Sequence, residues 1–411
     1  MSEPLSSNAT VVVVGASLAG LRAAEEIRHE GHAGPVVIVG DERHAPYDRP
    51  PLSKQLLAGT WDVERIHHHA PDKLDTLGLE FRLGHRAASL DTDARSIQFD
   101  DGSSLHYDGL IVATGASARS LPGTGGMPTV RCLRTLDDCL GIRADLEAAG
   151  EGARVVVIGA GFIGSEVAAT CHGLGAAVTV VEASPTPLSR VLGDQMGEAC
   201  AQLHRAQGVT LRTGVGVDRL TSDQGPDTPV VVHLADGTAV DADLVVVGIG
   251  VTPSVGWLDG SGLTLDNGVV CSEHLFAADQ VVAAGDVARW THPTLGEQLR
   301  VEHWTNAAEG GAAAARNLLA GSAAAVPYSP IPFFWSDQYK TKIQVIGLPG
   351  QDDEVVVVEG SAEEGKLVAL YRRGDRLRAV LAFSQPRHLM TYRPLLAAGA
   401  SFDEALALSR S

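Results

Sequence analysis

The sequence predicts an α/β protein with two Rossmann-like nucleotide-binding domains and a smaller C-terminal α+β domain. Three observations support this fold class. A valine-rich strand runs into a glycine turn and then a helix at residues 10–27, the same pattern returns at residues 155–170, and the composition changes at Pro327. A chain of 411 residues is also too long for a single hydrophobic core.

The first repeat forms a complete strand–helix–strand unit. Residues 10–15 form a short valine run that breaks on glycine, and residues 18–27 have apolar side chains at helical spacing. Residues 36–39 follow as a second strand, parallel to the first. Two such units in one chain predict two nucleotide ligands, or a duplicated fold in which one site has been lost.

The second repeat carries the stronger nucleotide motif, GAGFIG at residues 159–164. Its glycines permit a tight turn, the approach of backbone amides to a pyrophosphate, and close packing of the helix on the strand. Glu182 follows the next strand, residues 178–181, and lies 18 residues beyond Gly164. A carboxylate there accepts hydrogen bonds from both ribose hydroxyls and repels a 2′-phosphate, which predicts a preference for NADH over NADPH.

The first repeat reads GASLAG at residues 15–20, so Ser17 stands where a middle glycine is usual. Its hydroxymethyl group can be accommodated if it points away from the pyrophosphate or donates to it. The motif is therefore weaker as a signal, but the site is not excluded. Asp41 and Glu42 follow the second strand, and the sequence does not decide which of them reaches a ribose.

Three further segments end on small residues, namely 109–115 (GLIVATG), 243–250 (DLVVVGIG) and 281–286 (VVAAGD). Small residues at the carboxyl ends of strands let the backbone approach a ligand. We expect residues 1–117 and 250–326 to form one discontinuous domain and residues 118–249 a second. Residues 327–411 form the third, with alternating strands and a short helix.

Composition and charge argue against several classes of function. The formal charge of −18 disfavours a nucleic-acid partner, and the longest apolar runs are under half of the roughly 20 residues that a membrane helix needs. The N-terminus lacks the features of a secretory signal, so we expect a cytoplasmic protein. Residues 66–70 (IHHHA) are placed on a strand, where adjacent histidines point to opposite faces, and no metal site is expected. The scattered cysteines are expected to be reduced structural thiols: Cys132, Cys139, Cys171, Cys200 and Cys271.

Several stretches together resemble the NADH-dependent ferredoxin reductases of bacterial oxygenase systems. They are YDRPPLSK at 47–54, ATG at 113–115, GFIGSE at 161–166, AGD at 284–286, RVEHWTN at 300–306 and FWSDQY at 334–339. The resemblance covers nearly the whole chain, and DRPPLSK is far more specific than a glycine motif. It implies FAD in the first nucleotide-binding domain and NADH in the second. The implied reaction is hydride transfer from NADH to FAD, then single-electron transfer to a [2Fe-2S] ferredoxin serving a haem monooxygenase or a ring-hydroxylating dioxygenase.

The resemblance also gives roles to single residues. Lys54 would lie near the flavin, Asp286 would bond the ribityl chain, and Glu166 would face the nicotinamide. The alternatives are a solvated lysine at a helix start, a turn or helix cap, and a helix-surface acid, respectively. Lys54 and Glu166 are the candidate catalytic residues. The candidate cofactor-binding residues are Gly15, Ser17, Leu18, Ala19, Gly20, Asp41, Glu42, Arg49, Pro51, Lys54, Ala113, Thr114, Gly115, Gly159, Gly161, Phe162, Ile163, Gly164, Glu166, Glu182, Arg190, Gly250, Gly285, Asp286, Glu302, His303, Trp304 and Trp335.

Two tryptophans have open roles. Trp304 could stack near the flavin or the nicotinamide, or it could be a buried structural residue. Trp335 could form the apolar centre of the ferredoxin contact, or it could pack the junction between domains. Ferredoxins of these systems are acidic, so docking on a net-negative protein requires basic side chains near the flavin's exposed edge. The candidates are Arg316, Lys340, Lys342, Arg387 and Arg393.

Two rival functions share the fold. A disulfide, peroxide or oxygen reductase would place a redox cysteine over the flavin, in the region where this chain reads PPLSK, and no cysteine lies between Met1 and Arg131. The other rival is a flavoprotein that senses NADH and acts by binding or signalling to partners, which the fold alone does not exclude.

Overall fold

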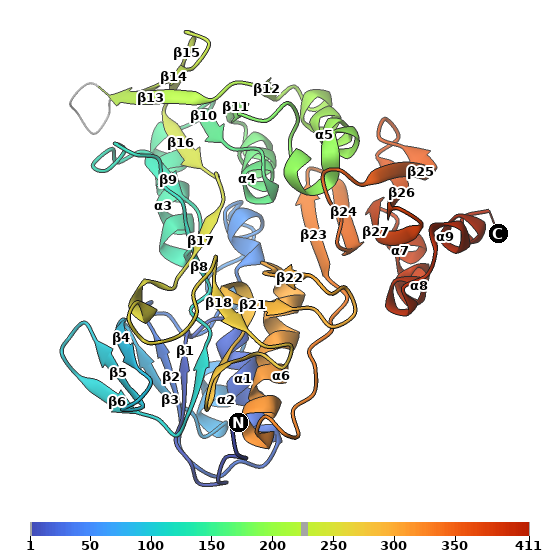
Figure 1. Ribbon diagram of the computed structural model, residues 1–411. Coiled ribbons are helices and arrows are strands. Elements are labelled where there is room, and N and C mark those ends of the chain that lie inside the picture. The colour runs from blue at the N-terminus through green and yellow to red at the C-terminus, as the bar shows by residue number, and fades with distance from the viewer. Residues whose placement is uncertain (1, 223–228, 411) are drawn as a thin grey trace. The chain divides into compact units, whose positions relative to one another are not determined.

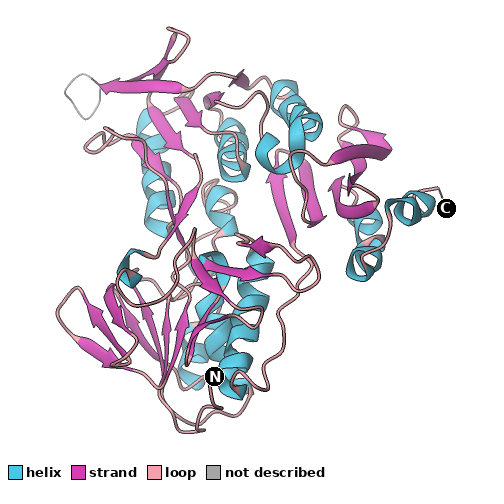
Figure 2. Ribbon diagram, in the orientation of Figure 1, coloured by secondary structure: helices cyan, strands magenta, loops and turns pink. Residues whose placement is uncertain are grey.

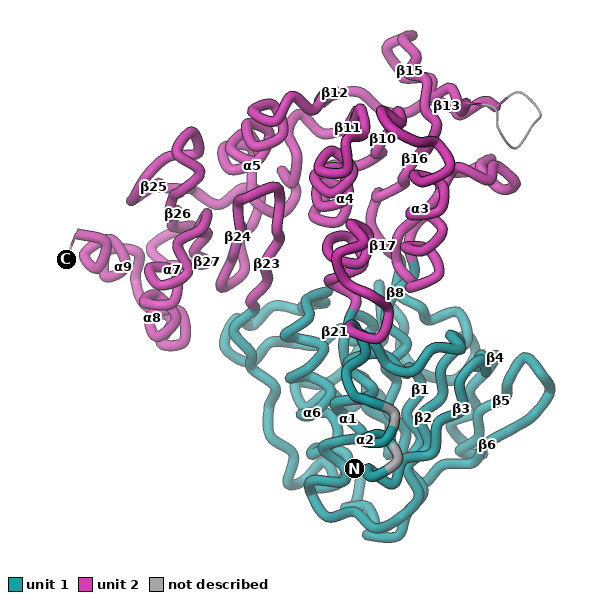
Figure 3. The backbone as a smooth tube through the Cα atoms, turned by 180° about the vertical axis from the view of Figure 1, so that it is seen from behind, with its two compact units in different colours: residues 1–48, 66–117, 252–332 teal, residues 49–65, 118–251, 333–411 magenta. Residues whose placement is uncertain are grey.

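Runs of valine and isoleucine build the parallel strands at the centre of both halves of the chain. The computed structural model describes residues 2–222 and 229–410, and the chain divides into two compact units (Figure 3). Unit 1 contains residues 1–48, 66–117 and 252–332. Unit 2 contains residues 49–65, 118–251 and 333–411.

The main sheet of unit 1 has the order β19-β20-β7-β1-β2-β3, of which β1, β2 and β3 are labelled in Figure 1. Its four central strands are parallel and buried, because β-branched side chains are covered on both faces. Val112 on β7 is in register with Val14 on β1 and with Ala283 on β20, so three carboxyl ends meet at one edge. The strands are β1 (Val11–Val14), β2 (Val36–Gly40), β3 (Glu80–Leu83), β7 (Gly109–Val112), β19 (Phe276–Ala278) and β20 (Val281–Ala283).

Helices α1 (Leu18–His29) and α6 (Trp304–Ala320) pack against each other beside this sheet. Smaller sheets and short helices complete unit 1 (Figure 2). They are β4 (Ala87–Asp91), β5 (Ser96–Phe99) and β6 (Ser104–His106); β18 (Val269–Cys271), β21 (Ala288–Thr291) and β22 (Gln298–Leu299); α2 (Pro71–Thr76); and the 3-10 helices η3 (Gly256–Leu258) and η4 (Gly285–Val287). A further 3-10 helix, η2 (Glu64–Ile66), spans the boundary between the units. The chain passes between the units at 48/49, within η2, within β8 (Ala116–Ala118), within β17 (Val251–Pro253) and at 332/333.

Unit 2 repeats the nucleotide-binding topology with the parallel order β12-β11-β10-β16-β9. Helices α3, α4 and α5 pack on these strands, while the three-stranded sheet β13-β14-β15 shares an apolar cluster with them. The elements are β9 (Val130–Cys132), α3 (Leu136–Ala149), β10 (Arg154–Ile158), α4 (Phe162–Gly173), β11 (Ala177–Glu182), α5 (Ser189–Ala206), β12 (Thr210–Thr213), β13 (Val217–Ser222), β14 (Val230–Leu234), β15 (Ala239–Ala242) and β16 (Leu244–Val247), with the 3-10 helix η1 (Pro50–Ser53).

An antiparallel sheet, β23-β24-β27-β26-β25, packs against α5 within unit 2. Helix α5 is interrupted at Gly193, whose φ of 73° is not helical. The buried Tyr371 hydroxyl donates to the carbonyl of Leu192 at 2.9 Å, beside this interruption. The elements are β23 (Phe333–Gln338), β24 (Thr341–Gly347), β25 (Glu354–Ser361), β26 (Lys366–Arg373), β27 (Arg376–Phe383), α7 (Pro386–Thr391), α8 (Arg393–Ala398) and α9 (Phe402–Leu408).

The predicted fold class is confirmed, with two Rossmann-like sheets and a C-terminal α+β region. The division into units falls at 117/118, 251/252 and 332/333, and it places residues 49–65 in unit 2. The prediction of a strand at residues 66–70 is wrong, because a 3-10 helix ends at Ile66 and His67 forms an isolated bridge with Tyr47. Three short helices follow the last strand where one was expected. Among the described residues, none of the helices is both long and apolar enough to cross a membrane.

Candidate functional site

The first glycine turn of unit 1 is packed so tightly that two of its positions require glycine. A Cβ atom on Gly15, whose φ is +122°, would lie 2.0 Å from the carbonyl oxygen of Ala113. A Cβ atom on Gly20 would lie 1.8 Å from the carbonyl oxygen of Gly15. The turn therefore lies against the strand end at Ala113, as expected for the carboxyl edge of a nucleotide-binding sheet.

The predicted residues around this turn lie together in unit 1. Ser17 is the N-cap of α1 and makes no side-chain capping bond to the helix, while Leu18 and Ala19 are buried in its first turn. Thr114 donates to the carbonyl of Ser254 at 2.8 Å, and Gly115 has a φ of +66°. An N-terminus with backbone amides not used by the N-cap side chain fits the pyrophosphate of a dinucleotide.

The AGD turn at residues 284–286 lies against the first glycine turn and the start of α1. A Cβ atom on Gly285 would lie 2.9 Å from the Cβ atom of Ala19, so η4 contacts the first turn of α1. Gly311 on α6 is closer still, because a Cβ atom there would lie 2.2 Å from the carbonyl oxygen of Ala19. Asp286 is half-buried in η4, and its carbonyl accepts a bond from Arg300 at 3.1 Å. The structure thus brings together the GASLAG, ATG and AGD segments that the sequence singled out.

The two acids after β2 differ in their surroundings. Asp41 is exposed, whereas Glu42 is half-buried and accepts a hydrogen bond from the Tyr47 hydroxyl at 2.5 Å. Both retain acceptor capacity, and the choice between them for the ribose stays open.

Residues 302–304 lead into α6 with three different environments. Glu302 is exposed and pairs with Arg300 at 2.6 Å. His303 is the N-cap of α6, and its pKa is lowered to about 4 by burial, against the opposing attraction of Asp286. Trp304 is half-buried and donates from Nε1 to Asp48 Oδ1 at 2.6 Å. A tryptophan fixed in this way is held at one ring orientation.

In the glycine turn of unit 2, two positions again have no room for a side chain, whereas a third position does. A Cβ atom on Gly159 would lie 2.4 Å from the carbonyl oxygen of Gly248. A Cβ atom on Gly164 would lie 2.0 Å from the carbonyl oxygen of Gly159. A Cβ atom on Gly161 would meet its nearest protein atom only at 4.0 Å. Packing therefore does not require glycine at position 161, and the open space fits a pyrophosphate that approaches the backbone.

Glu182 braces this turn through its carboxylate. Oε2 accepts from the backbone amide of Ala160 and Oε1 from that of Ser184, both at 2.7 Å. Each oxygen keeps a further lone pair for a ribose hydroxyl. Arg190 is exposed near the start of α5, and Gly250 has a φ of +99° with open space around it. Ile163 is 46% exposed, whereas Phe162 packs edge-on against Phe334 at 4.7 Å between ring centroids.

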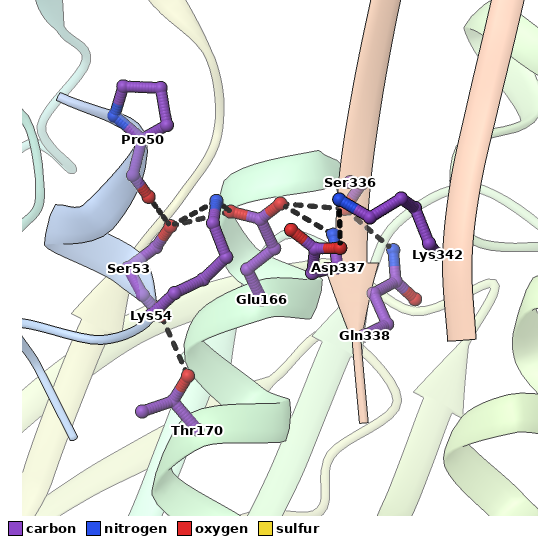
Figure 4. Close-up of polar contacts among 9 residues, drawn as sticks. All are labelled: Pro50, Ser53, Lys54, Glu166, Thr170, Ser336, Asp337, Gln338 and Lys342. Carbon is purple, nitrogen blue, oxygen red and sulfur yellow. Dashed lines mark hydrogen bonds and ion pairs between the residues drawn. The ribbon is translucent and has the colours of Figure 1, made fainter. Parts of the chain in front are cut away.

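A buried ion pair joins Lys54 and Glu166 (Figure 4). Lys54 Nζ lies 2.8 Å from Glu166 Oε2, and the side chains are 11% and 3% exposed. Lys54 follows η1 rather than starting a helix, and η1 also buries Pro51. The alternatives of a solvated lysine and a helix-surface acid are therefore wrong. Arg49, which precedes η1, donates to the carbonyl of Arg134.

Three further donors complete the surroundings of Glu166. The Ser53 hydroxyl donates to Oε2 at 2.5 Å, while the Ser336 hydroxyl and the Asp337 amide donate to Oε1 at 2.9 and 3.1 Å. All four contacts of the carboxylate come from donors, so the arrangement suits an ionised group that accepts only. A buried charge is tolerated when it is paired and hydrogen-bonded in this way. The arrangement holds the Lys54 ammonium group in one position.

All five basic docking candidates are exposed, but two of them are already paired. Arg316 lies 2.6 Å from Glu26 in unit 1, and Lys342 lies 3.0 Å from Asp337 in unit 2. Lys340, Arg387 and Arg393 are exposed. Trp335 is half-buried on the face of β23 opposite Phe334 and tilts against Phe333 at 6.2 Å between ring centroids.

Sequence reasoning missed Asp48, Ser53 and Ser336 as members of these networks. The first two lie inside the DRPPLSK stretch, and Ser336 lies inside FWSDQY. One signal was available for Ser336. Ser336 lies two residues after Phe334 and two before Gln338, so all three side chains point to the same, buried face of the strand. A polar side chain on the core face of a strand needs a hydrogen-bond partner.

Comparison with known proteins places these features in a family context. A family model described as pyridine nucleotide-disulphide oxidoreductase matches residues 9–311. A second model, described as reductase C-terminal, matches residues 333–410. The two matches together span the nucleotide-binding sheets and the C-terminal sheet.

Two curated relatives and one solved structure illustrate the similarity. The chain is 35% identical to rhodocoxin reductase of Rhodococcus erythropolis, over 98% of this chain and 95% of the relative. It is 36% identical to the ferredoxin–NAD(+) reductase component of the anthranilate 1,2-dioxygenase system of Burkholderia cepacia, over 95% of each chain. A chain in the crystal structure of the covalent putidaredoxin reductase–putidaredoxin complex aligns with a TM-score of 0.89 at 33% identity, covering 95% of this chain and 94% of that one.

Proposed function

The chain belongs to the pyridine nucleotide-disulphide oxidoreductase family, and on that premise we propose that it is an FAD-dependent NADH:ferredoxin oxidoreductase. Members of this family use FAD, and the relatives named ferredoxin–NAD(+) reductases use NADH. The proposed electron acceptor is a [2Fe-2S] ferredoxin that serves a haem monooxygenase or a ring-hydroxylating dioxygenase. The covalent complex with putidaredoxin supports this class of partner, because the chain aligns with it over nearly its whole length.

One observation carries the proposal, which is the buried pair of Lys54 and Glu166 at the helix that begins on the second glycine turn. FAD supplies the chemistry of accepting two electrons as a hydride and releasing them one at a time. The chain has to bind, orient and stabilise charge, and a fixed ammonium group is suited to holding negative charge near it. We assign that role to Lys54, with Glu166 holding Lys54 in place.

The cysteines argue against the disulfide-reducing rival. Burial is the main cause of a raised pKa at every one of the five thiols, to about 12 at Cys139, Cys171, Cys200 and Cys271. A thiol must ionise to attack a disulfide, so these groups are poor nucleophiles near neutral pH. All five are free thiols in the structure, which also supports a cytoplasmic location as part of the proposal.

The distribution of charge favours docking of an acidic ferredoxin at the C-terminal sheet. Residues 333–411 contain ten acidic and ten basic side chains, so the whole charge of −18 falls on residues 1–332. An acidic partner is therefore repelled least by the C-terminal region. Lys340 and Lys342 lie at the β23–β24 turn, and the backbone amide of Ser384, three residues before Arg387, donates to the carbonyl of Lys342 at 2.8 Å. We propose the turn and the start of α7 as the basic part of the docking surface.

The domain assignment is part of the same proposal. Residues 1–117 and 250–326 would bind FAD, residues 118–249 would bind NADH, and residues 327–411 would form the partner-binding domain. The FAD candidates at the GASLAG, ATG and AGD segments lie in unit 1, and the NADH candidates at GAGFIG lie in unit 2.

The test is NADH-dependent reduction of cytochrome c with a panel of purified [2Fe-2S] ferredoxins. We expect a yellow protein whose flavin is released by acid precipitation, with rapid cytochrome c reduction only when a matching ferredoxin is added. Slow flavin reduction that no ferredoxin accelerates, together with NADH-dependent association with another protein, would instead support the sensing rival.

A further inference from the structure

Strand β23 of the C-terminal sheet reaches the Lys54–Glu166 pair through a buried serine. Ser336 is fully buried, and its hydroxyl donates to Glu166 Oε1 at 2.9 Å (Figure 4). The neighbouring backbone amide of Asp337 donates to the same oxygen at 3.1 Å. The other oxygen, Oε2, takes the bonds from Lys54 and Ser53. The carboxylate is thus held at one end by β23 and at the other by the segment that carries Lys54.

The direction of the Ser336 hydroxyl is fixed by a second hydrogen bond. Gln338 Nε2 lies 3.3 Å from Ser336 Oγ, and Gln338 is also fully buried. A hydroxyl has one hydrogen, so Ser336 accepts from Gln338 and donates to Glu166. The chain of donors runs from Gln338 through Ser336 to Glu166 and delivers its last hydrogen to Oε1.

Packing gives no other reason for these polar residues. Phe334, Ser336 and Gln338 share the core face of β23, where Phe334 packs against Phe162 of α4. An apolar side chain at position 336 would cost less desolvation than a hydroxyl. A buried hydroxyl beside a buried charge is explained by the orientation that it gives to that charge.

We propose that Ser336, oriented by Gln338, is a positioning residue that sets the geometry of the Lys54–Glu166 pair for flavin reduction by NADH. The inference rests on the proposed function, since it assigns a role within that reaction. Loss of the Ser336 hydroxyl leaves Oε1 with the Asp337 amide as its one remaining donor among the described residues. The planar carboxylate can then rotate, and Lys54 moves with Oε2.

The test compares Ser336→Ala with Ser165→Ala in the full-length holoenzyme. Ser165 is a matched control because it adjoins Glu166, is fully buried, and has an Oγ atom that finds no hydrogen-bond partner among the residues that the structure describes. We expect Ser336→Ala to slow single-turnover flavin reduction by about tenfold while the KM for NADH changes by less than about twofold, since one hydrogen bond to a charged group is lost. Ser165→Ala should match the wild type. Gln338→Leu should slow the same step by less than Ser336→Ala.

A second measurement needs no cofactor. Four apoproteins are compared: the wild type, Ser336→Ala, Glu166→Gln and the double variant. The Tm of each is measured by thermal unfolding. We expect the loss of Tm caused by Ser336→Ala to fall by at least about half in the Glu166→Gln background, because the two side chains are coupled. Additive Tm losses, or wild-type reduction rates in both Ser336→Ala and Gln338→Leu, would overturn the inference. Absence of NADH-dependent flavin reduction in the wild type would overturn the proposed function instead, while the thermal cycle would still report on the coupling.

Discussion

Glu166 Oε2 lies 2.8 Å from Lys54 Nζ in a pair of side chains that are almost completely removed from solvent. The two residues are 112 positions apart in the sequence; Lys54 directly follows η1, and Glu166 lies on α4 of the same unit. Taking two charges out of water is costly, and such a pair persists only when its remaining hydrogen-bonding capacity is used. Ser53, Ser336 and the Asp337 amide use it here.

Replacing Lys54 by Met should lower both stability and activity. The variant keeps an apolar stem of similar length but leaves a buried carboxylate without its counter-charge, which costs about 3–5 kcal/mol in free energy of unfolding. Flavin reduction by NADH should slow by at least about tenfold, because a fixed positive charge is lost. Urea denaturation and stopped-flow absorbance measure the two effects. Lys340→Met, at an exposed lysine, is the control and should leave both unchanged. An unchanged free energy of unfolding in Lys54→Met would show that the pair is not formed.

Replacing Glu182 by Ala should narrow the preference for NADH. The wild type is expected to favour NADH over NADPH by at least about tenfold in kcat/KM, because a carboxylate binds a diol and repels a phosphate. The variant removes both the acceptor for the ribose diol and the charge that repels a 2′-phosphate, so NADH binding should weaken more than NADPH binding. Steady-state kinetics with both cofactors measures the ratio. Equal use of NADH and NADPH by the wild type would contradict this assignment.

Stability should fall with acidification partly because of His204. This histidine is fully buried on α5, its Nδ1 atom lies 2.7 Å from the Tyr339 hydroxyl oxygen, and burial lowers its pKa to about 4 from the ordinary value of 6.5. Between these pH values the unfolded chain binds the proton and the folded chain does not. Above about pH 6.5 His204 therefore does not lower the free energy of unfolding. As the pH falls toward 4, its protonation in the unfolded chain lowers the free energy of unfolding by about 3 kcal/mol in total.

His204→Gln removes the titrating group from the same position. The difference in free energy of unfolding between pH 7 and pH 4.5 should be smaller in this variant than in the wild type. Denaturant titrations at both pH values give the comparison, and carboxylates that titrate in the same range cancel between the two proteins. Identical pH dependence would mean that His204 is not buried as a neutral group.

Ferredoxin docking should depend more on Lys340 than on Arg316. Arg316 is already paired with Glu26, whereas Lys340 is exposed at the turn that follows β23, the strand that carries the half-buried Trp335. Lys340→Glu and Trp335→Ala should raise the KM for ferredoxin at low salt and leave ferricyanide reduction unchanged, since docking follows flavin reduction. Arg219→Glu, an exposed change on β13, is the charge-matched control. If neither Lys340→Glu nor Trp335→Ala changes this KM across a salt series, the ferredoxin binds elsewhere.

The strands and the two glycine turns could be predicted from sequence because their signals are local. Valine runs that end on glycine predicted β1 and β10, and the steric need for glycine at positions 15 and 164 follows from the turn itself. The AGD turn was also identified from sequence, but its contact with Ala19 depends on how α1 and α6 pack.

The burial of Lys54 and Glu166 could not be read from local sequence. A lysine beside two prolines and an acid on a helix are ordinary surface residues by composition, and only the pairing of distant segments removes them from water. The same limit applies to Ser336, whose partner lies 170 positions away. Family resemblance suggested Lys54 and Glu166 as functional residues, whereas Ser53 was identified only as a donor in the folded network, and the alternation along β23 indicates that Ser336 needs a partner without saying which one.

The number of ferredoxins reduced per NADH tests the central claim most directly. A fixed amount of NADH is added to the enzyme without oxygen, in the presence of excess oxidised [2Fe-2S] ferredoxin, and reduced ferredoxin is counted by its absorbance. Because a hydride carries two electrons and the cluster accepts one, the account predicts about two reduced ferredoxins for each NADH consumed. Consumption of NADH with no reduced ferredoxin, across ferredoxins from several oxygenase systems, would contradict it.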